Sequence, residues 1–306
     1  MKKKTLNFKH FNAAIKKFHT SESSSLELYF SLLLEMDNRK LLDENFISQM
    51  SDHDKTIQRL SELLILKYCI NSTHNKIYSK KDGPDIAFKF GDRTVNIELV
   101  IPLIVSQEKI SLRQYCYSLN GGPTAPISIE ASKPKTESLY ERITSTLTSK
   151  CRVYDEYLHK KKISTSDVNI ICINIGFIQE NDLIDFENIR YLFEKQVGIH
   201  INIDEEKNLS PSALDLDFYV KKDTGVEFTT SYFDNMKHPQ IDGVWIISCN
   251  ENSLNTIKNT YDPYRNMMYK NVNSKIDNTM LTSLRINTPQ PDSFAEHIRK
   301  QGSLPG

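Results

Sequence analysis

The sequence lacks the short motifs that assign a chemistry at once. It contains no Gly-rich phosphate-binding loop, no His-Glu-x-x-His zinc motif and no Gly-x-Ser-x-Gly nucleophile motif. It also has no apolar run that approaches the roughly 18 residues of a membrane span, and no signal-peptide pattern. We therefore expect a soluble protein without a transmembrane segment.

Cysteine is scarce and net charge is absent. The five cysteines form no Cys-x-x-Cys pair, and three of them fall among apolar residues of predicted strands or helices. This pattern favours buried thiols in a reducing, cytoplasmic compartment over disulfides or a zinc site. The 39 basic and 39 acidic residues give a formal net charge of +0. Zero charge argues against non-specific coating of nucleic acid but allows a local basic groove.

The most informative stretch is 81–102, which predicts a β-hairpin. Two runs rich in β-branched and aromatic residues flank the turn signal Gly91-Asp92, and prolines lie near both outer ends. Asp85 opens the first strand, and Glu98 lies inside the apolar second strand. A carboxylate in such a place must be paired, hydrogen-bonded or bound to a metal, because burying it alone costs several kcal/mol. Two carboxylates on adjacent strands can share a hard cation such as Mg²⁺.

The hairpin carries a resemblance to a known superfamily. Pro84-Asp85 at a strand start, a β-turn and Glu98 in the next strand resemble the PD-(D/E)XK, or restriction-endonuclease-like, nucleases. The resemblance implies Mg²⁺- or Mn²⁺-dependent hydrolysis of phosphodiester bonds in nucleic acid, with Asp85 and Glu98 as catalytic metal ligands. It also implies an α/β fold in which helices flank a mixed central sheet. The superfamily usually places a lysine two residues after the second acid, and that position here is Val100.

In some members of the superfamily the lysine comes from the following helix, so the next helix matters. We predict it from about Ser138 to about Lys161, because Ser138 and Glu141 form a capping box and apolar residues recur at spacings of three and four. That stripe consists of Leu139, Ile143, Leu147, Tyr154, Tyr157 and Leu158.

Lys150 falls inside this apolar stripe. It either replaces the missing strand lysine in catalysis, or it extends to the edge or neutralises a buried carboxylate without doing chemistry. Arg142, on the flank of the stripe, is a second candidate for contact with phosphate or with Glu98.

The elements around the hairpin follow the order of the nuclease-like core. We predict a helix over 54–70, then the hairpin, the capped helix, a strand over 167–178 that is buried on both faces, and a further strand over 241–249 in the same sheet. The resemblance therefore covers about 54–178. A long connection over 104–136 is predicted to be a functional loop that passes over the site.

Two further polar residues are candidates in this core. Gln107, in the long connection, is placed to contact substrate. Glu62, in the helix over 54–70, is either a third acid of the metal site or a solvated surface residue.

The remaining chain divides into an N-terminal helical segment (1–50), the nuclease-like core (51–250) and a C-terminal extension (251–306) that is partly irregular. Residues 1–20 predict a basic amphipathic helix, which either contacts an anionic membrane, a phosphate backbone or a protein partner, or docks on the core through its phenylalanines. A strand is predicted over 198–203 and a loop over 210–217.

Two functions are consistent with these patterns. The first is a metal-dependent nuclease in which Asp85 and Glu98 hold the metal and Lys150 orients the attacking water. The second is the same fold with an inactive site, acting as a protein- or membrane-interaction module. The valine at position 100 and the zero net charge favour the second.

Overall fold

The fold is described from a computed structural model of the chain. The residues that it describes are 8–18, 23–43, 45–73, 76–78, 83–102, 109–114, 127–132, 135–178, 188–194, 196–203, 207, 209–216, 219–221, 227–229, 233, 238–254 and 265–289.

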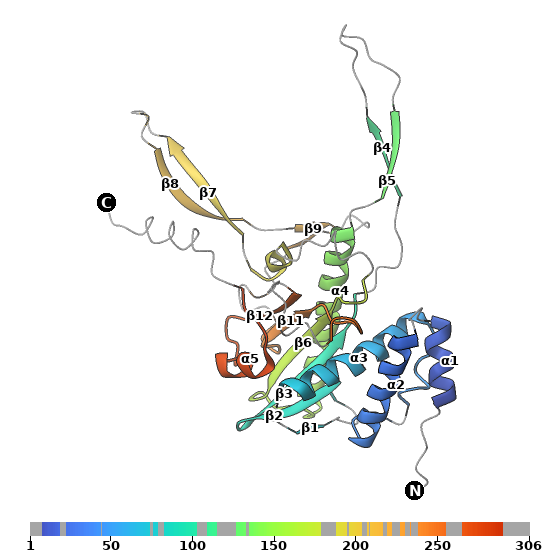
Figure 1. The fold of residues 1–306 in the computed structure, drawn as a ribbon. Coiled ribbons are helices and arrows are strands. Elements are labelled where there is room, and N and C mark those ends of the chain that lie inside the picture. Colours follow the sequence, from blue (N-terminus) through green and yellow to red (C-terminus); the bar gives the residue numbers. More distant parts are fainter. Residues whose placement is uncertain are drawn as a thin grey trace.

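The centre of the molecule is a six-stranded mixed sheet with the order β1-β2-β3-β6-β11-β12 (Figure 1). β3, β6 and β11 run parallel, while β1, β2 and β12 pair antiparallel with their neighbours. The strands are β1 (Ile77–Tyr78), β2 (Ile86–Phe90), β3 (Arg93–Val100), β6 (Val168–Asn174), β11 (Gly243–Ile247) and β12 (Asn266–Lys270). The expected α/β class, with helices flanking a mixed sheet, is confirmed.

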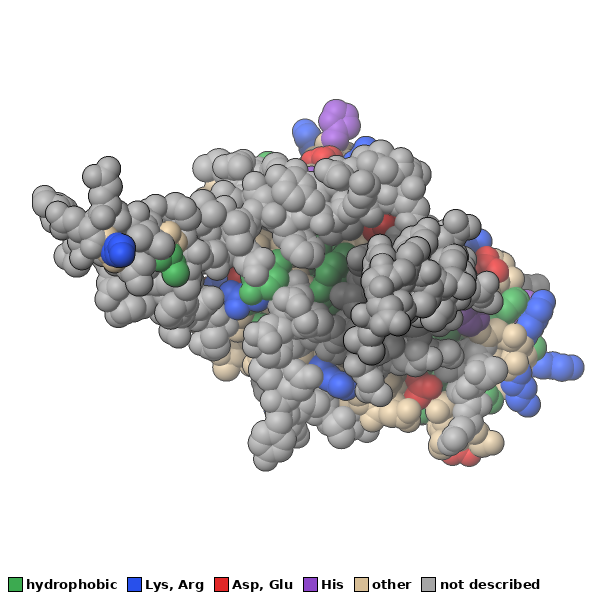
Figure 2. All heavy atoms as spheres, turned by 90° about the horizontal axis from the view of Figure 1, so that it is seen from above, with side chains coloured by type: hydrophobic (Ala, Val, Ile, Leu, Met, Phe, Trp, Pro, Cys, Tyr) green, Lys and Arg blue, Asp and Glu red, His purple; other side chains and the backbone are tan. Residues whose placement is uncertain are grey.

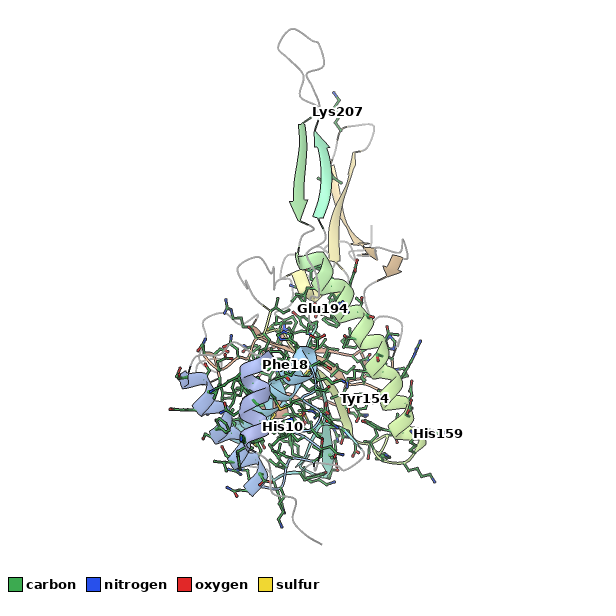
Figure 3. All side chains as sticks on the ribbon, turned by 90° about the vertical axis from the view of Figure 1, so that its right-hand side faces the viewer. His10, Phe18, Tyr154, His159, Glu194 and Lys207 are labelled. Atoms are coloured by element: carbon green, nitrogen blue, oxygen red, sulfur yellow. The ribbon has the colours of Figure 1, made fainter. Side chains whose placement is uncertain are left out.

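Apolar clusters cover both faces of this sheet. On one face, residues of α1 (Phe8–Phe18), α2 (Ser23–Asn38), α3 (His53–Ser72) and α5 (Asn278–Leu284) pack together. On the other face lies α4 (Lys135–His159). Figure 3 shows α1, with His10 and Phe18, and α4, with Tyr154, on opposite sides of the molecule. In β6, β11 and β12, successive side chains alternate between the two clusters, as the two-residue period of a strand requires.

The local sequence explains the central elements. Gly91 has φ 61° and begins the two-residue turn between β2 and β3, which is the predicted hairpin. β6 is buried along its whole length, as its apolar sequence predicts for a strand covered on both faces. α3 starts at the N-cap Asp52, whose side chain accepts from Lys55 N at 2.9 Å. α4 makes the crossover between parallel strands β3 and β6, and its bounds agree with the prediction within a few residues.

Segments at both ends of the chain belong to the same core. Phe11 of α1, Leu33 of α2 and Leu281 of α5 lie in one cluster with Trp245 of β11. A buried chain of hydrogen bonds connects the C-terminal segment to the sheet: Trp245 Nε1 donates to Asn266 Oδ1 (2.7 Å), and Asn266 Nδ2 donates to the Tyr68 hydroxyl (2.8 Å). The extension predicted over 251–306 therefore supplies an edge strand of the central sheet.

Peripheral hairpins account for two differences from the sequence predictions. The connection over 104–136, predicted to be a loop, contains an antiparallel pair, β4 (Lys109–Gln114) and β5 (Ile127–Ser132). β8 (Leu209–Leu216) pairs with β7 (Gln196–Ile203), so the strand near 198–203 is confirmed but the loop predicted over 210–217 is wrong. In Figure 1 both hairpins extend away from the sheet. The remaining pair is β9 (Tyr219–Lys221) with β10 (Glu227–Thr229), and a short 3-10 helix covers Asn188–Leu192.

No helix in the described part of the chain is long and apolar enough to cross a membrane.

Gly176→Ala tests the contact between the segments that follow β6 and β11. A Cβ atom at Gly176 would lie 2.4 Å from the backbone of Cys249. We expect the free energy of unfolding to fall by about 1–3 kcal/mol, because backbone cannot move aside as a flexible side chain can. Denaturant unfolding measures the loss. Lys89→Ala, at an exposed position of β2, is the control and should stay within about 0.5 kcal/mol of wild type. Equal stability of all three proteins would contradict this packing.

Candidate active site

The two carboxylates predicted from the sequence lie opposite each other on neighbouring strands. Ile86 of β2 pairs with Ile97 of β3, so the same register extended by one residue places Asp85 opposite Glu98. Directly opposed side chains lie on the same face of a sheet, with Cβ atoms about 5 Å apart. Asp85 is half-buried, and its Oδ2 accepts from Leu99 N at 2.8 Å. That hydrogen bond holds the carboxylate of Asp85 beside the end of β3.

Glu98 is buried, and α4 supplies the partners of its carboxylate. Only 3% of its surface is exposed. Lys150 Nζ lies 2.5 Å from Glu98 Oε2, and the Tyr157 hydroxyl lies 3.0 Å from Glu98 Oε1. The same hydroxyl is 3.2 Å from the carbonyl oxygen of Gly83, in the segment that carries Asp85. The side chain of Lys150 is 25% exposed, so the ion pair opens toward solvent on the lysine side.

Val100, the position at which the superfamily usually has lysine, belongs to the apolar cluster under α4. Glu98 and Val100 share one face of β3, since two residues separate successive side chains on a face. Lys150 reaches that face from the helix above it. The structure therefore brings Asp85, Glu98 and Lys150 together.

Tyr154 fixes α4 against the sheet at this point. Its hydroxyl is fully buried between β3 and β6, where it accepts from Glu98 N at 3.1 Å. It lies 2.7 Å from the Ile170 carbonyl oxygen and 3.1 Å from that of Asn96. Lys150, Tyr154 and Tyr157 follow one another at spacings of four and three, which place them on one face of a helix. This spacing is visible in the sequence, but there both tyrosines were predicted only to be part of the apolar stripe.

Glu62 reaches the same neighbourhood from α3. It is buried, with 7% of its surface exposed, and Arg59 Nη1 lies 2.5 Å from its Oε2. Arg59 also donates to Gln49 Oε1. One turn before Glu62, Gln58 Nε2 donates to the Leu99 carbonyl oxygen at 3.1 Å, which places this side of α3 at the end of β3. The alternative of a solvated surface glutamate is therefore wrong, because the fold covers this side of the helix.

Burial and the charge of Asp85 raise the pKa of both buried glutamates of this site. Burial, followed by the charge of Asp85, raises the pKa of Glu98 from 4.5 to about 7. Burial and the same charge raise the pKa of Glu62 from 4.5 to about 8. Burial opposes the positive charge of Lys150, but Glu98 and Asp85 outweigh it and raise the pKa of the lysine. Asp85 thus interacts electrostatically with all three other groups, which is an arrangement typical of functional sites.

The two substrate-binding candidates have different outcomes. Arg142 lies exposed on α4, about 12 Å along the helix axis from Lys150. The described partners of the Glu98 carboxylate are Lys150 and Tyr157, not Arg142. Gln107 lies outside the described residues.

The carboxylates fit a magnesium ion better than a metal that needs a full set of protein ligands. Among the described residues, no group of three or more His, Cys, Asp or Glu side chains is arranged to hold a metal. Mg²⁺ is usually bound through one or two carboxylates, with water and phosphate oxygens as its other ligands. Asp85 and Glu98 provide such a pair, and a cation between them would relieve the repulsion that raises the pKa of Glu98.

Comparisons of the chain with protein-family models, with curated proteins and with solved structures find no match. The geometry of the site therefore carries the functional proposal.

The raised pKa of Glu98 predicts how stability depends on pH. The unfolded chain releases this proton near pH 4.5, whereas the folded protein keeps it until about pH 7. The folded state thus binds more protons at Glu98 in this window, so the contribution of this residue to the free energy of unfolding falls as pH rises from about 4.5 to above 7. We expect Glu98→Gln to fall less steeply than wild type in denaturant unfolding across this range.

Glu156→Gln is the control for this measurement, since Glu156 is exposed on the same helix and pairs only with Lys160 among its described ion pairs. Parallel stability curves for wild type and Glu98→Gln would contradict the raised pKa.

Proposed function

We propose that the protein is a divalent-metal-dependent nuclease that hydrolyses phosphodiester bonds in nucleic acid. The observation that carries the proposal is the meeting of two opposed carboxylates with a partly exposed lysine at the end of a parallel strand. Asp85 and Glu98 come from a hairpin and Lys150 from the crossover helix, and the lysine lies 2.5 Å from Glu98.

Each residue of the site has a proposed role that follows from its position. Asp85 and Glu98 would hold the metal, and Glu62, whose raised pKa a bound cation would lower, would be the third acid near them. A bound Mg²⁺ lowers the pKa of a coordinated water and neutralises charge on a phosphate. Lys150 is held in its charged form by its neighbours, and it is placed to orient a nucleophile or contact a phosphate oxygen. Tyr157 restrains the Glu98 carboxylate and the segment before Asp85 at the same time.

The order of the elements supports the proposal. α3, the β2–β3 hairpin, α4 and β6 follow one another in the chain, with β3 and β6 parallel neighbours. This is the helix, hairpin, helix, strand order that the resemblance to PD-(D/E)XK nucleases implies. The first helix supplies Glu62, the hairpin supplies Asp85 and Glu98, and the second helix supplies Lys150.

The test is cleavage of plasmid DNA, single-stranded DNA and RNA with Mg²⁺ or Mn²⁺. We expect wild type to cleave at least one substrate, and Asp85→Asn and Lys150→Met each to lower the rate by about 100-fold or more, as loss of an electrostatic catalytic group does. Lys160→Met is the matched control, because Lys160 follows the end of the same helix and pairs with the exposed Glu156.

Absence of metal-dependent cleavage on every substrate would favour the inactive interaction module. One observation supports that alternative: both oxygens of Glu98 already have partners, Lys150 and Tyr157, and Val100 is apolar. Full activity of Lys150→Met would assign the lysine a purely structural role.

Metal binding has a readout that does not depend on activity. A divalent cation between the carboxylates stabilises the folded state, so Mg²⁺ should raise the melting temperature of wild type. We expect the rise to vanish in Asp85→Asn and to need a higher Mg²⁺ concentration in Glu62→Gln. A thermal shift titration at pH 8, where Glu98 is ionised, measures both, with Ca²⁺-free buffer and Glu156→Gln as control. An equal rise in all four proteins would contradict a site at Asp85.

A further inference from the structure

A basic groove lies between α1 and the segment that precedes α3. It has a volume of 570 Å³ and is lined by Lys9, His10 and Lys17 of α1, with Ser48 and Ser51 across from them. None of the described residues that line it is acidic. Figure 2 shows Lys and Arg side chains gathered at the right-hand edge of the molecule, the side on which Figure 1 places α1. Cations together with hydroxyl groups are the partners that phosphate oxygens prefer.

The acidic residues that follow the groove in the sequence, Asp52 and Asp54, do not cancel its positive charge. Asp52 accepts from the hydroxyl of Ser51 at 3.1 Å, but its carboxylate also caps α3 and forms an ion pair with Lys55 at 3.2 Å. Asp54 is exposed in the first turn of α3. Lys9 and Lys17 are exposed on α1, where Lys17 Nζ lies over the ring of Phe18.

The apolar face of α1 is already occupied by the protein itself. Phe11 and Ile15 are fully buried, and the ring of Phe11 meets that of Phe30 at 5.4 Å. Phe8 and Phe18 pack against the same core. A helix that binds a membrane surface needs its apolar face free to enter the lipid. The docking of α1 on the core, expected from its phenylalanines, thus leaves only the basic face for a partner.

α3 connects this groove to the candidate active site. His53, its first residue, hydrogen-bonds through Nδ1 to the Phe18 carbonyl oxygen at the end of α1. Further along the same helix, Gln58 contacts the carbonyl of Leu99, the neighbour of Glu98. From Asp52 to Glu62 the helix rises by about 15 Å.

From this connection we infer that the groove between α1 and the segment before α3 binds the phosphate backbone of the substrate nucleic acid. Lys9 and Lys17 contact phosphates, and Ser48 and Ser51 line the opposite side of the groove. The inference rests on the proposed nuclease function and adds a substrate-binding surface to it.

The test uses the full chain with Asp85→Asn, which prevents cleavage during a binding measurement. Fluorescence anisotropy with labelled duplex DNA, single-stranded DNA and RNA gives the affinity over a range of salt concentrations. Adding Lys9→Ala and Lys17→Ala should weaken binding about tenfold and flatten the salt dependence by roughly 0.9 for each lost phosphate contact on a duplex. Lys9→Arg with Lys17→Arg should keep the affinity, since the charge is retained.

The matched control removes the same charge elsewhere. Lys89 and Lys270 are exposed on β2 and β12, and Lys89→Ala with Lys270→Ala should leave the affinity and salt dependence unchanged. If both double variants change the affinity and the salt dependence by the same amount, the inference is overturned. The nuclease proposal would still stand if wild type cleaves nucleic acid.

The remaining outcomes separate the two proposals. Binding that depends on Lys9 and Lys17 without cleavage by wild type removes the nuclease function and supports the groove as a nucleic-acid surface. Absence of binding to all three nucleic acids overturns the inference. So does lysine-dependent binding only to phosphatidylserine vesicles, which would assign the groove to a membrane.

Discussion

The buried carboxylate of Glu98 is the constraint on which the site depends. An ionised carboxylate with 3% of its surface exposed loses several kcal/mol of hydration, so it must find charged or hydrogen-bonding partners. Asp85 opposite it makes the requirement more severe, because a second negative charge disfavours ionisation. Lys150 and Tyr157 meet part of this demand from α4. The pKa of Glu98 stays raised even with both partners present, which leaves room for a further positive charge.

The need of the Glu98 carboxylate for partners determines where α4 must lie. The helix has to place Lys150 and Tyr157 above the same strand residue, which their spacing of seven positions allows on one helical face. Tyr154 between them enters the space between β3 and β6 and hydrogen-bonds to the backbone of Glu98 itself. A shift of α4 along the sheet would separate all three contacts at once. The crossover helix is thus both the connection between parallel strands and the support of the site.

Sequence reasoning succeeded where local patterns decide the structure. The turn at Gly91, the capped helix that carries Lys150 and the apolar run of β6 are such patterns, and the structure contains them all. β12 was missed because its polar surroundings hide it, and its place depends on Asn266, whose partners are Trp245 and Tyr68 far away in the sequence. β8 contains Ser210 and Pro211, which are typical of turns, and pairing with β7 holds it as a strand.

The residues of the candidate site also form two groups: those that the local sequence identifies and those that only the tertiary structure identifies. Asp85, Glu98 and Lys150 were found because a charge in an apolar strand or stripe is conspicuous. Tyr154 and Tyr157 were not assigned to the site, since a tyrosine in an apolar stripe suits a core equally well. The burial of Glu62 could not be predicted, because α3 is apolar nearly all round and only the packing of neighbouring segments decides which side is covered. Local pattern therefore identifies the charges, and tertiary packing identifies their partners.

The most direct measurement of the central claim is anomalous diffraction from crystals soaked in Mn²⁺. We expect one strong peak between the carboxylates of Asp85 and Glu98, and no such peak in crystals of Asp85→Asn. Crystals without a peak, in which the Glu98 carboxylate keeps only Lys150 and Tyr157 as partners, would contradict a metal site and leave Lys150 as the structural counter-ion of a buried acid.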